Sequence, residues 1–161
     1  MLTKSSLQTA VKLITFFITN IGSPGNWAEA AKIAVDRWGS TIPIRGAISG
    51  PFSMASKLIA HDDLIMGCII NPDGIKELLS LCTQTAILYA NAFLSAGAQV
   101  IVFDSFVVPP MLSPELYSEI VLPFHKELFG FLKQNGREAQ SHTGYLSASG
   151  KCATGQYYSS P

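Results

Sequence analysis

The sequence contains few charged residues, and those present balance in sign. Charged side chains make up 14% of the 161 residues, against about 25% in an average soluble domain. The 11 Lys and Arg residues match 11 Asp and Glu, so the net charge is zero. Binding to nucleic acid or to an anionic membrane surface requires an excess of basic residues, so we expect neither partner. With 48% hydrophobic residues, much of the surface must be apolar or covered.

Cysteine is also scarce, and recognisable cofactor motifs are missing. Cys68, Cys82 and Cys152 are too few and too far apart for a disulfide framework, which is typical of a cytoplasmic protein. Cys68 and Cys82 fall in apolar helical stretches and are predicted to be core thiols. The sequence has no Gly-rich dinucleotide fingerprint, Walker loop, CxxC pair or nucleophile elbow. No apolar run reaches the roughly 18 residues that a membrane span needs, so we predict no membrane partner.

The sequence does contain alternating helical and strand patterns. Apolar spacing predicts N-terminal helices within residues 1–40, the second over residues 27–38. Residues 41–48 and 99–104 are short apolar runs typical of buried parallel strands. Further helices are predicted over residues 52–59, 62–70, 71–97 and 113–134, the last bent or ended at Pro123. This order predicts an α/β fold with parallel strands, covering helices and right-handed crossovers.

We divide the chain into three parts. Residues 1–40 form N-terminal helices, residues 41–140 form the α/β part, and residues 141–161 form a tail. The tail is rich in Ser, Gly and Tyr and contains no Val, Ile, Phe, Asp or Glu. Such a segment cannot bury enough apolar surface to offset its chain entropy. We expect it to be disordered or to be an aberrant end, at a position where the alternation requires another strand.

Candidate site residues follow both predicted strands. In parallel α/β sheets, reactive groups gather at the carboxyl ends of the strands. After the first strand, Ser49 and Ser53 flank a tight turn whose helix amides could hold an anion, although a turn with serine caps is an equal alternative. After the second strand, Asp104 and Ser105 place a carboxylate and a hydroxyl at the rim. This carboxylate could move a proton or bind a cation; a helix cap or a salt bridge is the alternative.

The three histidines are interpreted separately. His61 lies between two predicted helices beside two aspartates, which indicates a solvated turn. His125 follows Pro123 at the start of a helix and is predicted at the surface. His142 comes just past an expected third strand, where it could be a metal ligand or an acid, or simply part of the tail.

Four ordered blocks resemble the uroporphyrinogen decarboxylase superfamily. They are residues 50–58 (GPFSMASKL), 71–73 (NPD), 96–105 (AGAQVIVFDS), and 112–117 with 121–124 (LSPELY and VLPF). This superfamily contains porphyrinogen decarboxylases and corrinoid-dependent methyltransferases. The resemblance implies a (β/α)8 TIM barrel with its active site at the carboxyl ends of the strands. Such a barrel takes about 250 residues, so this chain would supply a partial, incomplete barrel.

The resemblance favours the methyltransferase branch. In the decarboxylases, the segment similar to residues 51–58 carries a tyrosine that contacts substrate carboxylates, and Lys57 stands in its place here. Ser105 matches a decarboxylase serine, but the essential aspartate and Arg-rich stretch have no counterpart in residues 1–40. Residues 107–110 (VVPP) look more like the methyltransferases. The predicted catalytic residues are Asp104 and Ser105, and the predicted substrate-binding residues are Ser49, Gly50, Phe52, Ser53 and Lys57.

The resemblance also suggests cofactors and partners. The methyltransferases are similar to zinc enzymes that use a His-x-Cys pair and a later cysteine, which implies His142 as a zinc ligand; Gly144 stands where the paired cysteine is expected. The predicted activity is methyl transfer from a corrinoid to a thiol, with a corrinoid protein and a homodimer as expected partners. One alternative is decarboxylation of a porphyrinogen without a cofactor. Another is a truncated, inactive half-barrel.

Overall fold

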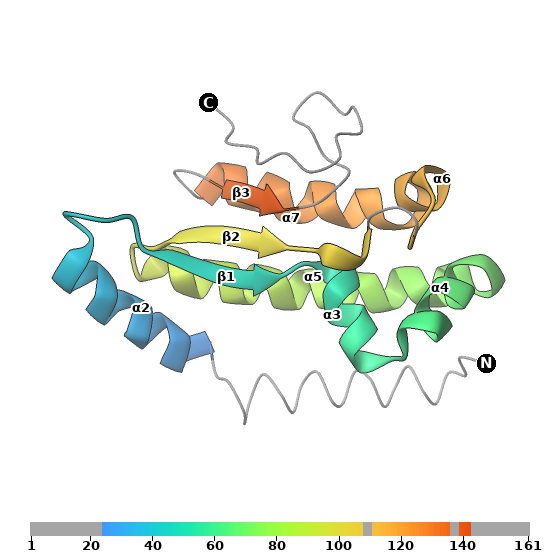
Figure 1. The fold of residues 1–161 in the computed structure, drawn as a ribbon, viewed down its shortest axis with the longest axis horizontal. Coiled ribbons are helices and arrows are strands. Elements are labelled where there is room, and N and C mark those ends of the chain that lie inside the picture. The colour runs from blue at the N-terminus through green and yellow to red at the C-terminus, as the bar shows by residue number, and fades with distance from the viewer. Residues whose placement is uncertain (1–23, 108–110, 136–138, 143–161) are drawn as a thin grey trace.

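The fold consists of a small parallel sheet and helices packed against it (Figure 1). The computed structural model describes residues 24–107, 111–135 and 139–142. The strands are β1 (Arg45–Ser49), β2 (Gln99–Phe103) and β3 (Ala139–His142), in the order β1-β2-β3. The helices are α2 (Pro24–Trp38), α3 (Pro51–Leu58), α4 (His61–Ile70), α5 (Pro72–Ser95), α6 (Pro114–Leu116) and α7 (Leu122–Asn135), with a 3-10 turn η1 (Ser105–Val107) and a π-helix η2 (Tyr117–Val121).

The two faces of the sheet differ in burial. Ile48, Val100 and Val102 belong to a buried cluster that also contains residues of α5 and α7. The alternate positions on the other face are more open, and the Phe103 side chain is 42% exposed. On the buried face, the Phe93 ring of α5 occupies the space that a Cβ at position 46 would need, so glycine fits there. Among the described residues, the helices therefore cover one face, as they do in a sector of a barrel.

Helix α5 is the central core helix. Asn71 Oδ1 accepts a hydrogen bond from Gly74 N at 3.3 Å at its start, and Gly97, with φ +82°, follows its end. The predicted apolar stripe is confirmed by burial, for example at Ile75, Leu79 and Phe93. By length and composition α5 could also cross a membrane. The same apolarity is typical of a core helix, and ten of its residues are buried in this fold.

A π-helix joins α6 to α7 in place of the predicted bend at Pro123. Ser113 Oγ caps α6 by accepting a hydrogen bond from Leu116 N at 3.3 Å. Pro123 has no N–H for an i→i−4 bond to Glu119, and its ring crowds that carbonyl. The chain widens instead, so that Leu122 N donates to Tyr117 O, five residues back. Pro123 then lies in the first turn of α7, where it needs no partner.

Two sequence-based boundaries change. The first strand begins at Arg45 rather than at residue 41, since Pro43 cannot donate to a ladder. Strand β3 pairs in parallel with β2 through His142, so the α/β part extends two residues into the segment predicted as tail. The predicted first N-terminal helix and residues 143–161 of the tail lie outside the described residues.

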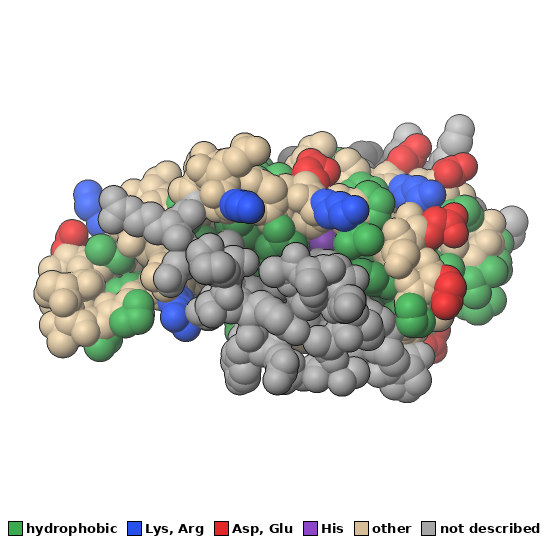
Figure 2. All heavy atoms as spheres, turned by 90° about the horizontal axis from the view of Figure 1, so that it is seen from above, with side chains coloured by type: hydrophobic (Ala, Val, Ile, Leu, Met, Phe, Trp, Pro, Cys, Tyr) green, Lys and Arg blue, Asp and Glu red, His purple; other side chains and the backbone are tan. Residues whose placement is uncertain are grey.

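The surface carries the apolar residues that the composition predicts. Trp27, Trp38, Met66, Ile69 and Ile70 are each more than half exposed. On the face that Figure 2 shows, basic and acidic side chains stand among hydrophobic and uncharged ones.

Candidate functional site

The carboxyl ends of β1 and β2 lie side by side. Ser49 pairs with Phe103 in the parallel register, and Gly50 N donates to Phe103 O at 2.7 Å. The chain then turns from β1 into α3 and from β2, through Asp104, into η1. Both turns predicted as candidate sites are therefore neighbours on one rim.

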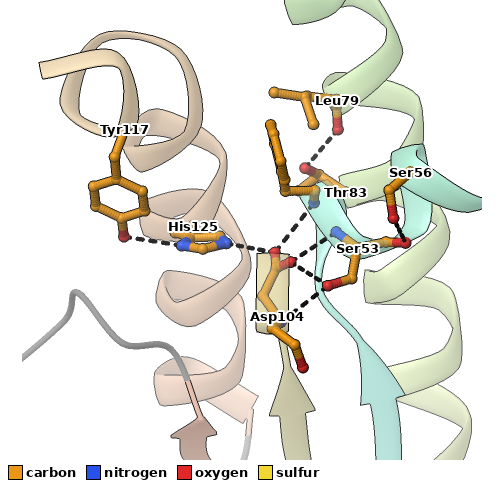
Figure 3. Close-up of polar contacts among 9 residues, drawn as sticks. Ser53, Ser56, Leu79, Thr83, Asp104, Tyr117 and His125 are labelled. Atoms are coloured by element: carbon orange, nitrogen blue, oxygen red, sulfur yellow. Dashed lines mark hydrogen bonds and ion pairs between the residues drawn. The ribbon is translucent and has the colours of Figure 1, made fainter. Parts of the chain in front are cut away.

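Asp104 is fully buried and caps the first turn of α3 across the strands (Figure 3). Its Oδ1 accepts hydrogen bonds from Ser53 N at 2.7 Å and Ser53 Oγ at 2.6 Å. Its Oδ2 accepts from Phe52 N at 3.1 Å and is 2.8 Å from His125 Nε2. A carboxylate at a helix N-terminus satisfies orphan amides and interacts favourably with the helix dipole. The four contacts occupy both carboxylate oxygens and hold the rim backbone in place.

Ser53 connects α3 to the turn after β2. Its hydroxyl donates to Asp104 and accepts a hydrogen bond from Ser105 N at 3.0 Å. Its backbone oxygen accepts from Ser56 Oγ at 2.8 Å. The side chain is 6% exposed, so it supports the rim rather than facing solvent.

Gly50 is required by a close approach. A Cβ at Gly50 would overlap the carboxylate and Cβ of Asp104. The φ of Gly50 is −71°, which any residue adopts. Space for Asp104, rather than backbone conformation, therefore favours glycine at this position.

His125 is the residue that the sequence misplaces most clearly. It was predicted at the surface, but its side chain is fully buried, paired with Asp104 and 3.0 Å from Tyr117 Oη through Nδ1. The prediction is wrong because His125, Leu128 and Leu132 share the buried face of α7. Their i, i+3, i+7 spacing was the available signal.

The charge of Asp104 acts on two other buried groups. Burial raises the pKa of Tyr117, and the negative charge of Asp104 raises it further. The same two causes, in the same order, raise the pKa of Cys82 to about 12. Both groups are therefore protonated at neutral pH and remain uncharged neighbours of the carboxylate.

The remaining predicted residues divide between the surface and the core. Lys57 is exposed, and its Nζ donates to Ser49 Oγ at 3.1 Å. Ser105 is also exposed, whereas Phe52 is fully buried in the core. The structure thus brings all seven predicted rim residues together: Ser49, Lys57 and Ser105 on the accessible side, and Gly50, Phe52, Ser53 and Asp104 beneath them.

Comparison with known proteins connects this rim to a family. The model of the uroporphyrinogen decarboxylase (URO-D) family matches residues 19–146. The chain belongs to the uroporphyrinogen decarboxylase family. This membership confirms the superfamily resemblance seen in the four sequence blocks.

Relatives from both branches of the family are similar to this chain. Methylcobamide:CoM methyltransferase MtaA of Methanosarcina barkeri is 35% identical over 94 residues, which cover 58% of this chain and 28% of MtaA. Uroporphyrinogen decarboxylase of Carboxydothermus hydrogenoformans is 35% identical over 115 residues, which cover 67% of this chain and 32% of the decarboxylase. The chain thus spans about a third of the length of the curated relatives it matches.

A solved structure supports the fold. A methyltransferase from Methanosarcina mazei superposes with a TM-score of 0.63 at 26% identity, and the match covers 70% of this chain and 33% of that one. This chain has three parallel strands with covering helices. Its fold is therefore α/β and forms part of a (β/α)8 barrel.

The described residues do not fit the zinc site that the methyltransferase branch suggests. His142 ends β3 opposite Phe103, so its backbone reaches the same rim. The described part of the chain contains no group of three His, Cys, Asp or Glu residues that could hold a metal. Cys68 and Cys82 are buried, and burial raises their pKa values to about 11 and about 12. A cysteine binds zinc as a thiolate, which these two cysteines do not readily form.

His61 also differs from its prediction as part of a solvated turn. It is the first residue of α4, and its ring lies 4.8 Å from that of Phe106 between centroids. Its two ring nitrogens are buried and have no hydrogen-bond partner among the residues that the structure describes. The ring contact with Phe106 of the turn after β2 joins residues distant in the sequence, and no local sequence signal indicated it.

Proposed function

We propose that this chain forms the substrate-binding rim of a methyltransferase of the uroporphyrinogen decarboxylase family. The proposed reaction transfers a methyl group from a methylated corrinoid to a thiol. In that reaction a thiolate sulfur forms a bond to the methyl carbon while the carbon–cobalt bond breaks, and its electron pair stays on cobalt. MtaA of Methanosarcina barkeri and the methyltransferase from Methanosarcina mazei support this branch.

The observation that carries the proposal is the exposed Lys57 at the rim. Its ammonium group is 3.1 Å from Ser49 Oγ, at the position where the decarboxylases carry a tyrosine. A lysine gives a compact cation with three donors and cannot replace a phenol. We assign Lys57 and Ser49 to binding an anionic group of the substrate, and Ser105 to contact near the reacting atoms.

Asp104 receives a supporting role in this proposal. Its carboxylate is fully buried and already accepts hydrogen bonds from Phe52, Ser53 and His125. It therefore acts on substrate through the backbone that it fixes. Its predicted direct catalytic role stays a prediction.

Porphyrinogen decarboxylation is the second candidate. The decarboxylase of Carboxydothermus hydrogenoformans is as similar in sequence as MtaA, and Ser105 stands in the place of the decarboxylase serine. That reaction needs a carboxylate that stabilises a pyrrole cation. The essential aspartate of the decarboxylases has no counterpart in residues 1–40, which favours methyl transfer.

The proposal also includes the cellular compartment of the protein and its binding partners. The free thiols of Cys68 and Cys82 support a reducing, cytoplasmic setting. A corrinoid protein is the proposed methyl donor. A homodimer is the other proposed partner, and size-exclusion chromatography of the chain tests it against a monomer and against aggregation.

Chimeric enzymes test the branch, because the chain spans about a third of its curated relatives. Residues 41–136 replace the matching segment in the Methanosarcina barkeri methyltransferase and, separately, in the Carboxydothermus hydrogenoformans decarboxylase. We expect turnover of methylcobalamin with a thiol in the first chimera and no conversion of uroporphyrinogen in the second. The reverse result would support decarboxylation. Loss of both activities in folded chimeras would support an inactive half-barrel.

Replacing Lys57 in the chimeras sharpens this test. Lys57→Tyr should lower kcat/KM for methyl transfer by about tenfold, which corresponds to 1.4 kcal/mol, and should restore measurable decarboxylation in the decarboxylase chimera. Lys133→Tyr, at an exposed position in the last turn of α7, is the matched control and should change neither activity. Unchanged kinetics of Lys57→Tyr in both chimeras would contradict the role of the lysine cation in substrate binding.

A further inference from the structure

Four buried polar side chains form one continuous chain of hydrogen bonds. Tyr117 contacts His125, His125 contacts Asp104, and Asp104 accepts from Ser53 (Figure 3). The exposed fractions of these side chains are between 0% and 6%. They come from η2, α7, the end of β2 and α3, so the network joins elements that are distant in the sequence.

The proposed direction of each bond follows from an ionised Asp104 and a neutral His125 ring. An ionised carboxylate only accepts hydrogen bonds, so His125 Nε2 carries the proton of the 2.8 Å contact with Asp104. In the neutral ring Nδ1 is then an acceptor, and the Tyr117 hydroxyl at 3.0 Å is its donor. Burial and the charge of Asp104 raise the pKa of Tyr117, which keeps that hydroxyl protonated.

The far end of the network is backbone at the rim. Asp104 accepts hydrogen bonds from the amides of Phe52 and Ser53, and Ser53 Oγ accepts from the amide of Ser105. These amides belong to the first turn of α3, the helix that carries Lys57, and to the turn that carries Ser105. A change in the orientation of the His125 ring would therefore reach the rim through Asp104.

The other titratable group near this network does not compete for the carboxylate. Cys82 of α5 feels the charge of Asp104, and burial is the larger cause of its raised pKa, about 12. The thiol is therefore protonated and uncharged. The partners of the carboxylate are then the His125 ring, the Ser53 hydroxyl and the α3 amides.

We propose that His125 is a positioning residue whose tautomer is set jointly by Asp104 and Tyr117, and that it fixes, through Asp104, the backbone of both rim turns. The π-helix thereby controls the geometry of the β1–α3 turn through this hydrogen-bonded network. This coupling goes beyond the proposed function, because it holds whichever reaction the rim carries.

Nitrogen-15 NMR of the 161-residue chain tests the tautomer. In the unchanged protein, the two ring nitrogens of His125 should have widely separated shifts, with the proton on Nε2. Tyr117→Phe should bring the two shifts closer together and should also move the amide signals of Phe52, Ser53 and Ser105. Tyr89→Phe, which removes a hydroxyl from α5 outside this network, is the matched control and should leave them unchanged. A proton on Nδ1, or rim amides that do not respond to Tyr117→Phe, would overturn the proposal.

A double-mutant cycle measures the coupling independently. Tyr117→Phe combined with Ser53→Ala should change the unfolding equilibrium constant by at least about threefold relative to the product of the single effects. The control cycle pairs Tyr117→Phe with Thr85→Val, which loses a separate buried bond to Leu81 O. For substitutions at distant, independent sites, the combined effect on the unfolding equilibrium constant matches the product of the single effects to within about twofold. A Ser53 cycle that is as additive as the Thr85 cycle would contradict the coupling.

Discussion

At the scale of single residues, the absence of a side chain at Gly50 leaves room for the side chain of Asp104. The Asp104 carboxylate lies where a side chain on Gly50 would be, and it uses that closeness to reach the amides of Phe52 and Ser53. Glycine at position 50 is thus a steric requirement of the buried network. The Gly50 position and the buried Asp104 carboxylate therefore depend on each other.

Gly50→Ala should lower the free energy of unfolding by about 2 kcal/mol, because the added methyl group displaces the Asp104 carboxylate from a packed site. Urea titration followed by circular dichroism measures this change. Gly130→Ala is the control, since a Cβ at Gly130 would contact nothing within 4 Å. That substitution should stabilise α7 by up to about 1 kcal/mol. Equal effects of the two substitutions would argue against the steric role of Gly50.

The buried thiols make stability depend on pH in the alkaline range. The pKa of Cys68 rises from 9.0 to about 11 and that of Cys82 from 9.0 to about 12 on folding. The unfolded chain loses these protons first, so stability is fully present below pH 9 and falls above it. We expect a loss of at most about 1.4 kcal/mol per pH unit for each thiol. Urea titrations from pH 7 to alkaline pH measure the slope, and Cys82→Ala should reduce it.

At the scale of elements, helix ends and one π-turn decide where side chains lie. Pro114 and Pro72 start helices behind Ser113 and Asn71, and Pro123 leaves a carbonyl without its usual partner. The resulting π-helix rotates the chain so that the Tyr117 hydroxyl meets His125. In a regular α-helix without the wider π-turn, the segments before and after it would be rotated differently about the helix axis, so Tyr117 and His125 would not face each other in this way.

Asn71→Ala should destabilise the fold by about 1 kcal/mol, because the amide of Gly74 loses its capping acceptor. Thermal and urea unfolding measure the change. Asn91→Ala, at an exposed position inside the same helix, is the control and should be neutral or stabilising by up to about 0.7 kcal/mol. If both alanines behave alike, the Asn71 cap contributes nothing.

At the scale of the whole molecule, the sheet has one face packed by helices and one more open face. Val102 is fully buried, whereas its neighbour Phe103 is 42% exposed. A three-stranded sector of a family barrel has this asymmetry because its helices cover only the outer face. The large apolar composition follows from the same asymmetry.

Truncation on the two faces should therefore differ in cost. Val102→Ala should lower the free energy of unfolding by about 2 kcal/mol, since two buried methyl groups are lost. Phe103→Ala should cost less than about 1 kcal/mol, although it removes more atoms. Guanidinium titration of the two variants decides this. A larger loss for Phe103→Ala would show that the open face is packed in solution.

The sequence by itself determined the order of elements, the α/β class, the family and the residues of both rim turns. These features depend on apolar period, caps, prolines and short motifs, all of which act within a few neighbouring residues. Element boundaries were less certain: β1 began four residues late, and β3 reached into the segment predicted as tail. Strand ends depend on pairing with another strand, which local patterns do not report.

Only the tertiary structure decided which rim residues face solvent and which support the rim. Asp104 and His125 are 21 residues apart in the sequence and lie on different elements, and Tyr117 reaches them through a π-turn. A buried hydrogen bond between such residues leaves no periodic signal in the chain. It forms because folding removes water from three polar groups at once, and each must then find its partner in the others.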